Sequence, residues 1–362
     1  MQWELLFAEC STQIIYISYM RRIVTTDKKG KKKLVNIPSW DLIYVNNQMG
    51  QPAYDVSISS NGSGSADSST PVVSGTQKAI FGYGYTIMPV SMTNLVSNTG
   101  VVATDTTGVG TARYSLAAAG YGSDKAIFGY GNTGTVVSMT NLVSNTGVVA
   151  TDTTGVGTAR RLLAAAGYGS DKAIFGYGYV AASVSMTNLV SNTGVVSTDT
   201  VGVGTARLQL AAAGYGSDKA IFGYGYGSGG ETSITNLVSN TGVVATDTVG
   251  VGTARYSLAA AGYGSDKAIF GYGNSDISGV VSITNLVSNT GIVTNNVSGV
   301  GTPRRDLAAA GYGTDKAIFG YGTTGTVVSM TNLVSNTGVV ATDTTGVGTA
   351  RQQLAAAGYS LS

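Results

Sequence analysis

The amino-acid sequence predicts an all-β protein, a six-bladed β-propeller whose blades each have four strands. Three observations lead to this prediction. A unit of 47 to 49 residues occurs six times, every unit holds a run of very small side chains, and the last copy supplies a segment that the first copy lacks. Four short strands in a repeat of this length are typical of propeller blades.

Two strings define the repeat. The string Lys-Ala-Ile-Phe-Gly-Tyr-Gly begins at Lys78, Lys125, Lys172, Lys219, Lys267 and Lys316. The string Leu-Ala-Ala-Ala-Gly-Tyr begins at Leu116, Leu163, Leu210, Leu258, Leu307 and Leu354. No segment has a 3.6-residue apolar period, so we expect few helices.

One unit divides into four predicted strands, named A to D. Strand A covers 116–121, strand B 125–130, strand C about 136–143 and strand D 148 to about 153. Only small side chains fit where the innermost strands of a propeller converge, so the Ala-Ala-Ala-Gly run assigns strand A to that position. Asn and Gly near the C–D turn tolerate the positive φ of a tight hairpin.

This unit resembles a kelch repeat over Lys78 to Ser362. The similarity lies in the small-residue strand, the glycine-rich end of the second strand, and the long hairpin that ends in Thr-Ala-Arg or Thr-Pro-Arg. The unit differs in having Gly-Tyr-Gly in place of a double glycine and no tryptophan after the third strand. The resemblance implies the propeller architecture and no particular function.

The ends of the chain predict how the ring closes. The first unit begins at strand B with Lys78, and the last stops after strand A at Tyr359. The C-terminal strand therefore completes the first blade and removes an open sheet edge. Residues 71–77 are a weaker candidate for that strand because Pro71 departs from the repeat. An open β-solenoid is the alternative architecture, but it would need atypical capping units at both ends.

The residues before the repeats differ in composition. We expect residues 1–56 to form an N-terminal extension that could serve as an attachment segment, 57–77 to be a Ser/Gly-rich linker, and 78–362 to be the propeller. A cluster of basic residues in the extension is weak evidence for binding to nucleic acid or to an anionic membrane. It comprises Lys28, Lys29, Lys31, Lys32 and Lys33. No signal peptide or membrane-spanning run is evident.

Composition argues against an enzyme. The chain has no histidine and one cysteine, which removes the commonest general base and most transition-metal sites. Charged residues make up 11% and the formal charge is +2, so we expect neither nucleic-acid binding nor membrane insertion. No cofactor or metal is predicted, since one aspartate per A–B turn falls short of a calcium site.

Six arginines recur before strand A and admit two interpretations. They are Arg113, Arg160, Arg207, Arg255, Arg304 and Arg351. One interpretation is an anion-binding ring. The favoured one is pairing with the aspartate eight residues earlier, as Arg113 with Asp105. Asn296 replaces this aspartate in one unit, so the pair is not required everywhere.

The six copies differ at two places. The B–C connection varies in both sequence and length. The pair of residues after each arginine varies in sequence alone. In a four-strand meander both lie at the same rim, so we predict that they form a recognition surface. Neutral drift is the alternative, but it would alter both rims. The candidate ligand-binding residues are Tyr85, Tyr114, Asn132, Arg161, Tyr179, Gln209, Tyr226, Tyr256, Asn274, Arg305, Thr323 and Gln352.

The expected function is recognition or adhesion. Through this rim the module would bind a surface glycan or a protein, as part of a virion tail or another extracellular fibre, a location favoured over the cytoplasm. The alternative is an intracellular kelch-type scaffold for a protein partner. The sequence leaves the ligand and the oligomeric state open.

Overall fold

The computed structural model describes residues 22–26, 32–36, 44–46, 55–57 and 78–360. Contacts divide the chain into two units, Met1–Pro71 and Val72–Ser362. The described residues are all-β and contain no helix, as predicted. Accordingly, none of these residues lies in a helix that could cross a membrane.

The first unit contains two short antiparallel strand pairs. Strand β1 (Arg22–Thr26) pairs with β2 (Lys32–Asn36), and β3 (Tyr44–Asn46) pairs with β4 (Asp55–Ser57). Of the predicted basic cluster, the first three lysines lie outside the described residues. Except for Ser57, the predicted linker 57–77 lies outside them too.

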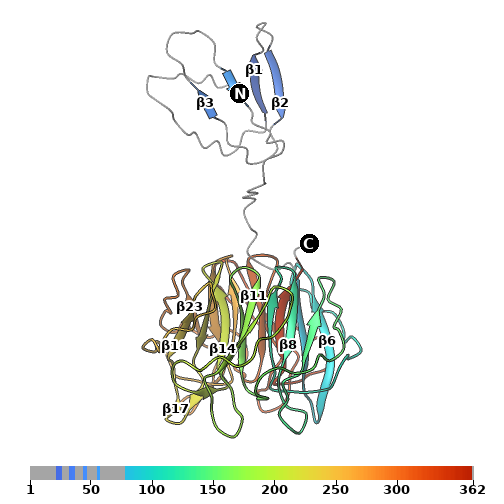
Figure 1. The fold of residues 1–362 in the computed structure, drawn as a ribbon, viewed down its shortest axis with the longest axis vertical. Helices are drawn as coiled ribbons and strands as arrows, with labels where there is room; N and C mark the ends of the chain where they lie inside the picture. Colours follow the sequence, from blue (N-terminus) through green and yellow to red (C-terminus); the bar gives the residue numbers. More distant parts are fainter. Residues whose placement is uncertain (1–21, 27–31, 37–43, 47–54, 58–77, 361–362) are drawn as a thin grey trace. The chain divides into compact units, whose positions relative to one another are not determined.

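The second unit is built from six antiparallel sheets of three strands (Figure 1). Sheet 1 consists of β27 (Ala355–Tyr359), β5 (Lys78–Tyr85) and β6 (Pro89–Val96). Sheet 2 consists of β7 (Ala117–Tyr121), β8 (Lys125–Gly129) and β9 (Thr140–Val143). Sheet 3 consists of β10 (Ala164–Tyr168), β11 (Lys172–Gly176) and β12 (Thr187–Val190). Sheet 4 consists of β14 (Ala211–Tyr215), β15 (Lys219–Gly223) and β18 (Thr235–Val238). Sheet 5 consists of β19 (Ala259–Tyr263), β20 (Lys267–Gly271) and β23 (Thr284–Val287). Sheet 6 consists of β24 (Ala308–Tyr312), β25 (Lys316–Gly320) and β26 (Thr331–Val334). In each sheet these are strands A, B and C of the repeat.

Two B–C connections contain further short strands. Strand β16 (Tyr226–Gly227) lies between β13 (Arg207–Leu208) and β17 (Gly230–Glu231). Strand β21 (Asn274–Ser275) pairs with β22 (Gly279–Val280). These are the two connections in which the sequence has extra residues.

Strand D is reduced to isolated bridges, which corrects the prediction of four full strands. In sheet 2 the bridges are Thr140↔Thr153 and Val143↔Val149. Three residue steps separate the partners on β9 and four separate those on the D segment, so D carries one extra residue, as in a β-bulge. The side-chain amide of Asn141 donates to the carbonyl of Ala150 and joins the two segments within the bulge.

Adjacent inner strands approach so closely that glycine fits best between them. A Cβ atom added to Gly214 of β14 would lie 3.3 Å from the carbonyl oxygen of Gly167 in β10. Gly167 meets Gly120 of β7 at the same spacing. This spacing is the physical reason for the fourth residue of the Ala-Ala-Ala-Gly run.

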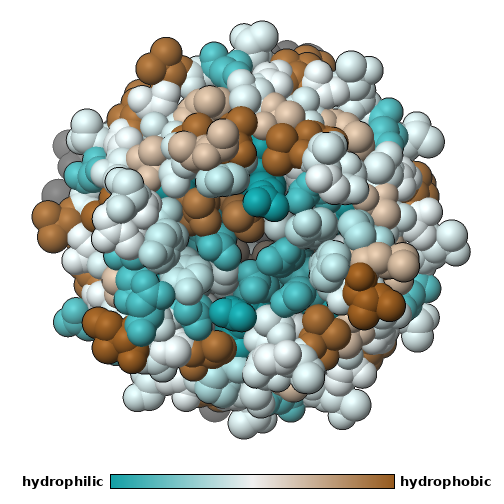
Figure 2. Space-filling model, turned by 90° about the horizontal axis from the view of Figure 1, so that it is seen from below, coloured by the Kyte–Doolittle hydropathy of each residue, from teal (hydrophilic) through white to brown (hydrophobic). Residues whose placement is uncertain are grey.

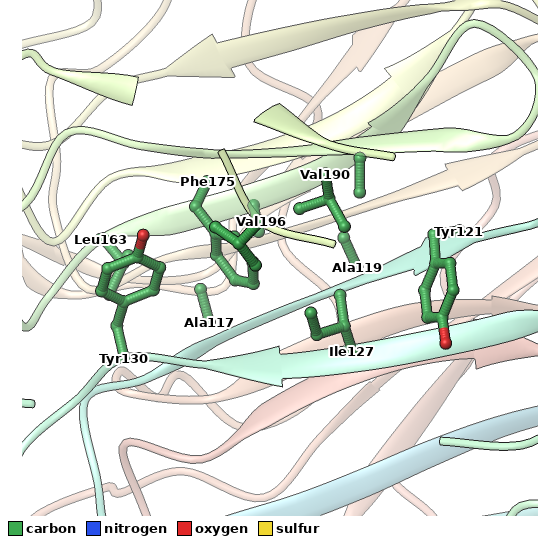
Figure 3. Packing of buried hydrophobic residues seen from close by; sticks show 11 residues of the cluster. Ala117, Ala119, Tyr121, Ile127, Tyr130, Leu163, Phe175, Val190 and Val196 are labelled. Carbon is green, nitrogen blue, oxygen red and sulfur yellow. The ribbon is translucent and has the colours of Figure 1, made fainter. Parts of the chain in front are cut away.

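The core consists of six similar apolar clusters between neighbouring sheets. In the cluster of sheets 2 and 3, Ile127 and Tyr130 meet Phe175 and Val190, with the small side chain of Ala119 between the strands (Figure 3). The ring centroids of Tyr130 and Phe175 are 5.1 Å apart. Large side chains of strands B and C therefore fill the space that the alanines of strand A leave.

The C-terminal strand completes the first sheet. Strand β27 pairs antiparallel with β5, from Ala355 opposite Gly82 to Tyr359 opposite Lys78. Inner strands contact in the order β7, β10, β14, β19, β24 and β27, and β27 also contacts β7. Residues 71–77, the other candidate for this position, lie outside the described residues. The arrangement is compatible with a β-propeller.

Deletion of residues 352–362 should destabilise the sheet assembly because it leaves β5 with an unpaired inner edge. We expect aggregation, or loss of the cooperative thermal transition, in circular dichroism and size-exclusion measurements. A synthetic peptide of residues 351–362, added in trans, should restore a monodisperse species. An unchanged melting curve for the deleted chain would contradict this role of β27.

Candidate binding face

The two variable sites of each repeat are joined by backbone hydrogen bonds. Tyr114, the first residue after the arginine, exchanges two such bonds with Asn132 of the B–C connection, at 2.9 and 3.1 Å. The corresponding bridges are Tyr85↔Gln352, Arg161↔Tyr179, Tyr256↔Asn274 and Arg305↔Thr323, and Leu208 pairs with Tyr226 through β13 and β16. The B–C connections and the pairs after the arginines thus form one surface, here called the variable face.

Aromatic side chains on this face meet across neighbouring repeats. The ring centroids of Tyr85 and Tyr114 are 5.0 Å apart, and those of Tyr226 and Tyr256 are 5.3 Å apart. Within a single repeat, the guanidinium of Arg161 lies over the ring of Tyr179 at 5.4 Å. Side chains from separate repeats thus share local surfaces.

The predicted ligand-binding residues differ in how accessible they are. Tyr226 is 36% exposed, and Tyr85, Tyr114, Tyr179 and Tyr256 are partly exposed. Arg161, Gln209, Asn274, Arg305 and Gln352 are partly exposed as well. Asn132 and Thr323 are buried at 5% and 6%, so their side chains support the loops. Each accepts a hydrogen bond from a backbone N–H two residues later.

A closed ring of six backbone hydrogen bonds lies beside these residues. It is formed by the second residue after each arginine, whose N–H donates to the carbonyl of its counterpart in the preceding repeat at 2.8–2.9 Å. The members are Ser115, Leu162, Gln209, Ser257, Asp306 and Gln353. All six have φ between 52° and 57°. Sequence reasoning identified only Gln209 among them, although the variability of the pair was a usable signal.

The side chains of this ring line a cavity together with the leucine that follows each of them. Figure 2 shows hydrophilic residues around a central hollow, with apolar patches farther out. Gln209 donates from Nε2 to Ser257 Oγ at 2.7 Å, and Ser115 donates from Oγ to Gln353 Oε1 at 3.1 Å. The ring thus presents a partly connected polar network that Leu162 interrupts.

Asp306 is the acidic member of the ring, and its side chain is only 12% exposed. Burial raises the pKa of its carboxyl group, while hydrogen bonds with Ser257 and Gln353 and the charge of Arg305 act in the opposite direction. The nearest Arg305 nitrogen, Nε, is 3.8 Å from Oδ2. Asp306 therefore places an acidic group within a largely neutral ring.

Each repeated arginine is completely buried, which rules out the anion-binding ring. The guanidinium of Arg113 lies 4.3 Å from the ring centroid of Tyr83 in sheet 1. Within sheet 2, its Nε donates to the carbonyl of Tyr130 at 2.9 Å and its Nη2 to Asn141 Oδ1 at 2.6 Å. We call this arrangement the arginine clamp. It connects two neighbouring sheets.

The carboxylate partner of each clamp corrects the prediction. Arg113 is 3.8 Å from Asp152 in the D segment of sheet 2, and it makes no ion pair with Asp105, eight residues before it in the D segment of sheet 1. Asp105 instead faces Arg351 at 3.9 Å. The linker before each arginine passes to the next sheet, so the partner belongs to that sheet. The other pairs are Arg160–Asp199, Arg207–Asp247 and Arg304–Asp343.

One clamp is incomplete. Asn296 stands where the aspartate is expected, and it accepts the N–H of Thr253 and donates to its hydroxyl. Arg255 has no ion pair among the described residues, and neither its Nη2 nor Asn285 Oδ1 has a hydrogen-bond partner there. A buried cation without a carboxylate is costly. The clamp at sheet 5 is therefore the weakest of the six.

The clamp aspartates have lowered pKa values. Burial alone would raise the pKa of Asp152, but hydrogen bonds from Thr111 and Asn141, with the charge of Arg113, outweigh it. Burial raises the pKa of Tyr177 to about 12, against the opposing charge of Arg207. Both groups therefore keep the protonation state that the clamp requires at neutral pH.

The opposite end of each sheet carries the A–B turn. Asp124 pairs with Lys125 and also accepts a hydrogen bond from Asn145 of the C–D turn. Its backbone carbonyl accepts the N–H of Ser360. These contacts support the prediction that the aspartates stabilise turns. The described residues contain no group of three His, Cys, Asp or Glu side chains that could hold a metal.

Comparison with models of protein families and with curated proteins finds no match for this chain. The function must therefore be argued from the geometry.

Replacement of Asn296 by aspartate should stabilise the protein, because it supplies the carboxylate that Arg255 lacks. We expect about 1 kcal/mol in the free energy of unfolding at neutral pH, measured by chemical denaturation. The lowered pKa of the clamp aspartates means that such a contribution is present above the ordinary value of 3.8 and is lost as pH falls through the lowered value. The gain should therefore vanish in strong acid.

Asp152→Asn is the matched control and should destabilise by a similar amount, since it gives sheet 2 the composition of sheet 5. Equal stability of Asn296→Asp and the unmodified protein at neutral pH would show that the ion pair contributes nothing.

Replacement of Asp306 by asparagine should also raise the stability at neutral pH. The folded state raises the pKa of this carboxyl group, so its charged form costs stability once pH exceeds the ordinary value of 3.8. Below that pH both states are protonated and the variant should match the unmodified protein. Thermal melts across acid and neutral pH measure this, and a shift independent of pH would contradict it.

Proposed function

We propose that residues 78–362 form a closed six-bladed propeller of kelch-like repeats that acts as a non-enzymatic recognition or adhesion module. It binds a surface glycan or protein through the variable face, as part of a virion tail or another extracellular fibre. The observation that carries this proposal is the backbone pairing of the two variable sites in every repeat. Sequence differences among the copies are thereby concentrated on one surface.

The contrast with the supporting layer favours recognition over drift. All six repeats have the same arginine, the same tyrosine beneath it and the same asparagine in strand C. The side chains of these three residues are buried in every repeat. The residue immediately after each buried arginine varies among Tyr, Arg, Leu and Gln. A rigid support with variable loops at one end is the usual design of a binding surface.

The exposed aromatic side chains suit such a role. Tyrosine offers a large apolar ring and a hydroxyl group at low entropic cost, so it is common in recognition surfaces. The unit-1 B–C loop also exposes Ile87 and Met88, at 85% and 60%. Together these residues give a partner both apolar and hydrogen-bonding contacts.

The test is binding of the full chain to a glycan array and to intact candidate host cells. Simultaneous change of Tyr85, Tyr179 and Tyr226 to alanine should lower binding at least ten-fold and leave the melting curve unchanged. The control changes Val101, Val148 and Val243 to serine. These valines follow the C–D turns at the other end of the sheets and are 65% to 66% exposed.

Unaltered binding by the triple tyrosine variant would overturn the assignment of the variable face. Failure of the folded protein to bind any glycan or cell, with capture of a defined partner from a cell lysate, would replace the adhesive role with that of an intracellular scaffold.

A further inference from the structure

Two boundaries between neighbouring sheets carry the same group of side chains. Tyrosine cluster 1 consists of Tyr85, Tyr114 and Asn132, and tyrosine cluster 2 consists of Tyr226, Tyr256 and Asn274. In each cluster two tyrosine rings from neighbouring repeats meet at 5.0 to 5.3 Å. In each, the asparagine Nδ2 donates to the hydroxyl of the second tyrosine, at 2.8 and 2.7 Å.

The two clusters occupy related positions. Cluster 1 lies between sheets 1 and 2, and cluster 2 between sheets 4 and 5, three repeats later. Inner strands contact in a cycle of six, so three steps lead from one cluster to the opposite side of the cycle. At the other four boundaries the residue after the arginine is Arg161, Leu208, Arg305 or Gln352, and no second tyrosine is present.

The ring residues beside the clusters show the same relation. Ser115 follows Tyr114 and is hydrogen-bonded to Gln353 of the preceding repeat in the ring, and Ser257 follows Tyr256 and is hydrogen-bonded to Gln209. The same Ser–Gln contact thus occurs beside both tyrosine clusters, at positions three repeats apart. This second set of contacts argues that the variable face holds two copies of one arrangement.

The chemistry of the clusters fits a neutral sugar. The rings are tilted by 59° in cluster 1 and 81° in cluster 2, so they form an angled aromatic surface against which the C–H face of a pyranose ring can pack. The tyrosine hydroxyl groups, held in place by the asparagine amides, can bond the sugar hydroxyls. At cluster 2, Asp276 accepts a hydrogen bond from Tyr256 at 3.3 Å, so its negative charge would disfavour an acidic sugar at that site.

We propose that each tyrosine cluster binds one pyranose ring of a neutral oligosaccharide, so that a single chain has two similar sugar sites. This inference rests on the proposed function and specifies its ligand class and the number of sites. Two sites on one rigid support bind a surface rich in the same sugar far more strongly than either site alone.

The experiment uses the full chain and a printed array of neutral oligosaccharides, with lactose and 3′-sialyllactose as a matched neutral and acidic pair. The strongest neutral hit is then titrated in solution by isothermal calorimetry. We expect two molecules bound per chain and a preference for lactose over its sialylated form. Tyr114→Ala and Tyr256→Ala should each reduce the stoichiometry to one without a large change in Kd, and lower the array signal at least ten-fold.

The double variant should lose sugar binding, while Tyr114→Phe with Tyr256→Phe retains the rings and part of the affinity. Val195→Ser, after a C–D turn, is the control for folding and should bind like the unmodified chain. A stoichiometry of one, or binding retained by the double alanine variant, would overturn the two-site inference and leave the recognition role standing. Absence of all glycan and cell binding by the folded, unmodified chain would overturn both.

Discussion

The rest of the structure depends on a fully buried guanidinium group that must be satisfied from two neighbouring sheets. Arg113 stacks on Tyr83 of one sheet. It donates hydrogen bonds to Tyr130 and Asn141 of the next sheet and lies 3.8 Å from Asp152 of that sheet. The tyrosine whose carbonyl accepts the guanidinium has a positive φ, of 61° to 64° in all six repeats. This conformation costs about 1–3 kcal/mol for a side chain of that size. The carbonyl of Tyr130 accepts a hydrogen bond from Nε of Arg113, and its ring lies under the guanidinium of Arg160. One strained tyrosine therefore takes part in two clamps.

The clamp also explains how the ends of the chain meet. Arg351 comes just before β27. It donates to the carbonyl of Tyr83 and to Asn94 Oδ1 and lies 3.9 Å from Asp105, and all three residues are in the first repeat. These contacts match those of the complete internal clamps, so the last linker binds the first sheet as the internal linkers bind the next one. Strand pairing and the clamp together fix the C-terminal strand. Neither requires a residue type that the other repeats lack.

Sequence alone predicted the features that depend on local pattern. Strands A and B, the pairing of the C-terminal strand with Lys78–Tyr85 and the joint position of both variable sites follow from repeat length and composition. The predicted partner of Arg113, Asp105, was wrong. Asp105 is close in sequence, but the linker carries the arginine to the next sheet, where Asp152 lies. The short D segment and the ring containing Ser115 were missed because a bulge and a cyclic hydrogen-bond pattern appear only when the strands are placed in space.

The six residues of the hydrogen-bond ring combine a strained backbone conformation with variable side chains. At φ values of 52° to 57°, glycine would be the least strained choice, yet the six positions hold Ser, Leu, Gln, Ser, Asp and Gln. The C–D turn also needs a positive φ, and there the chain does use glycine, as at Gly147 with a φ of 84°. Side chains that persist at six strained positions, and that differ from copy to copy, are better explained by what they contact than by the fold. The backbone ring fixes the geometry of this surface, and the six variable side chains give it its chemical character.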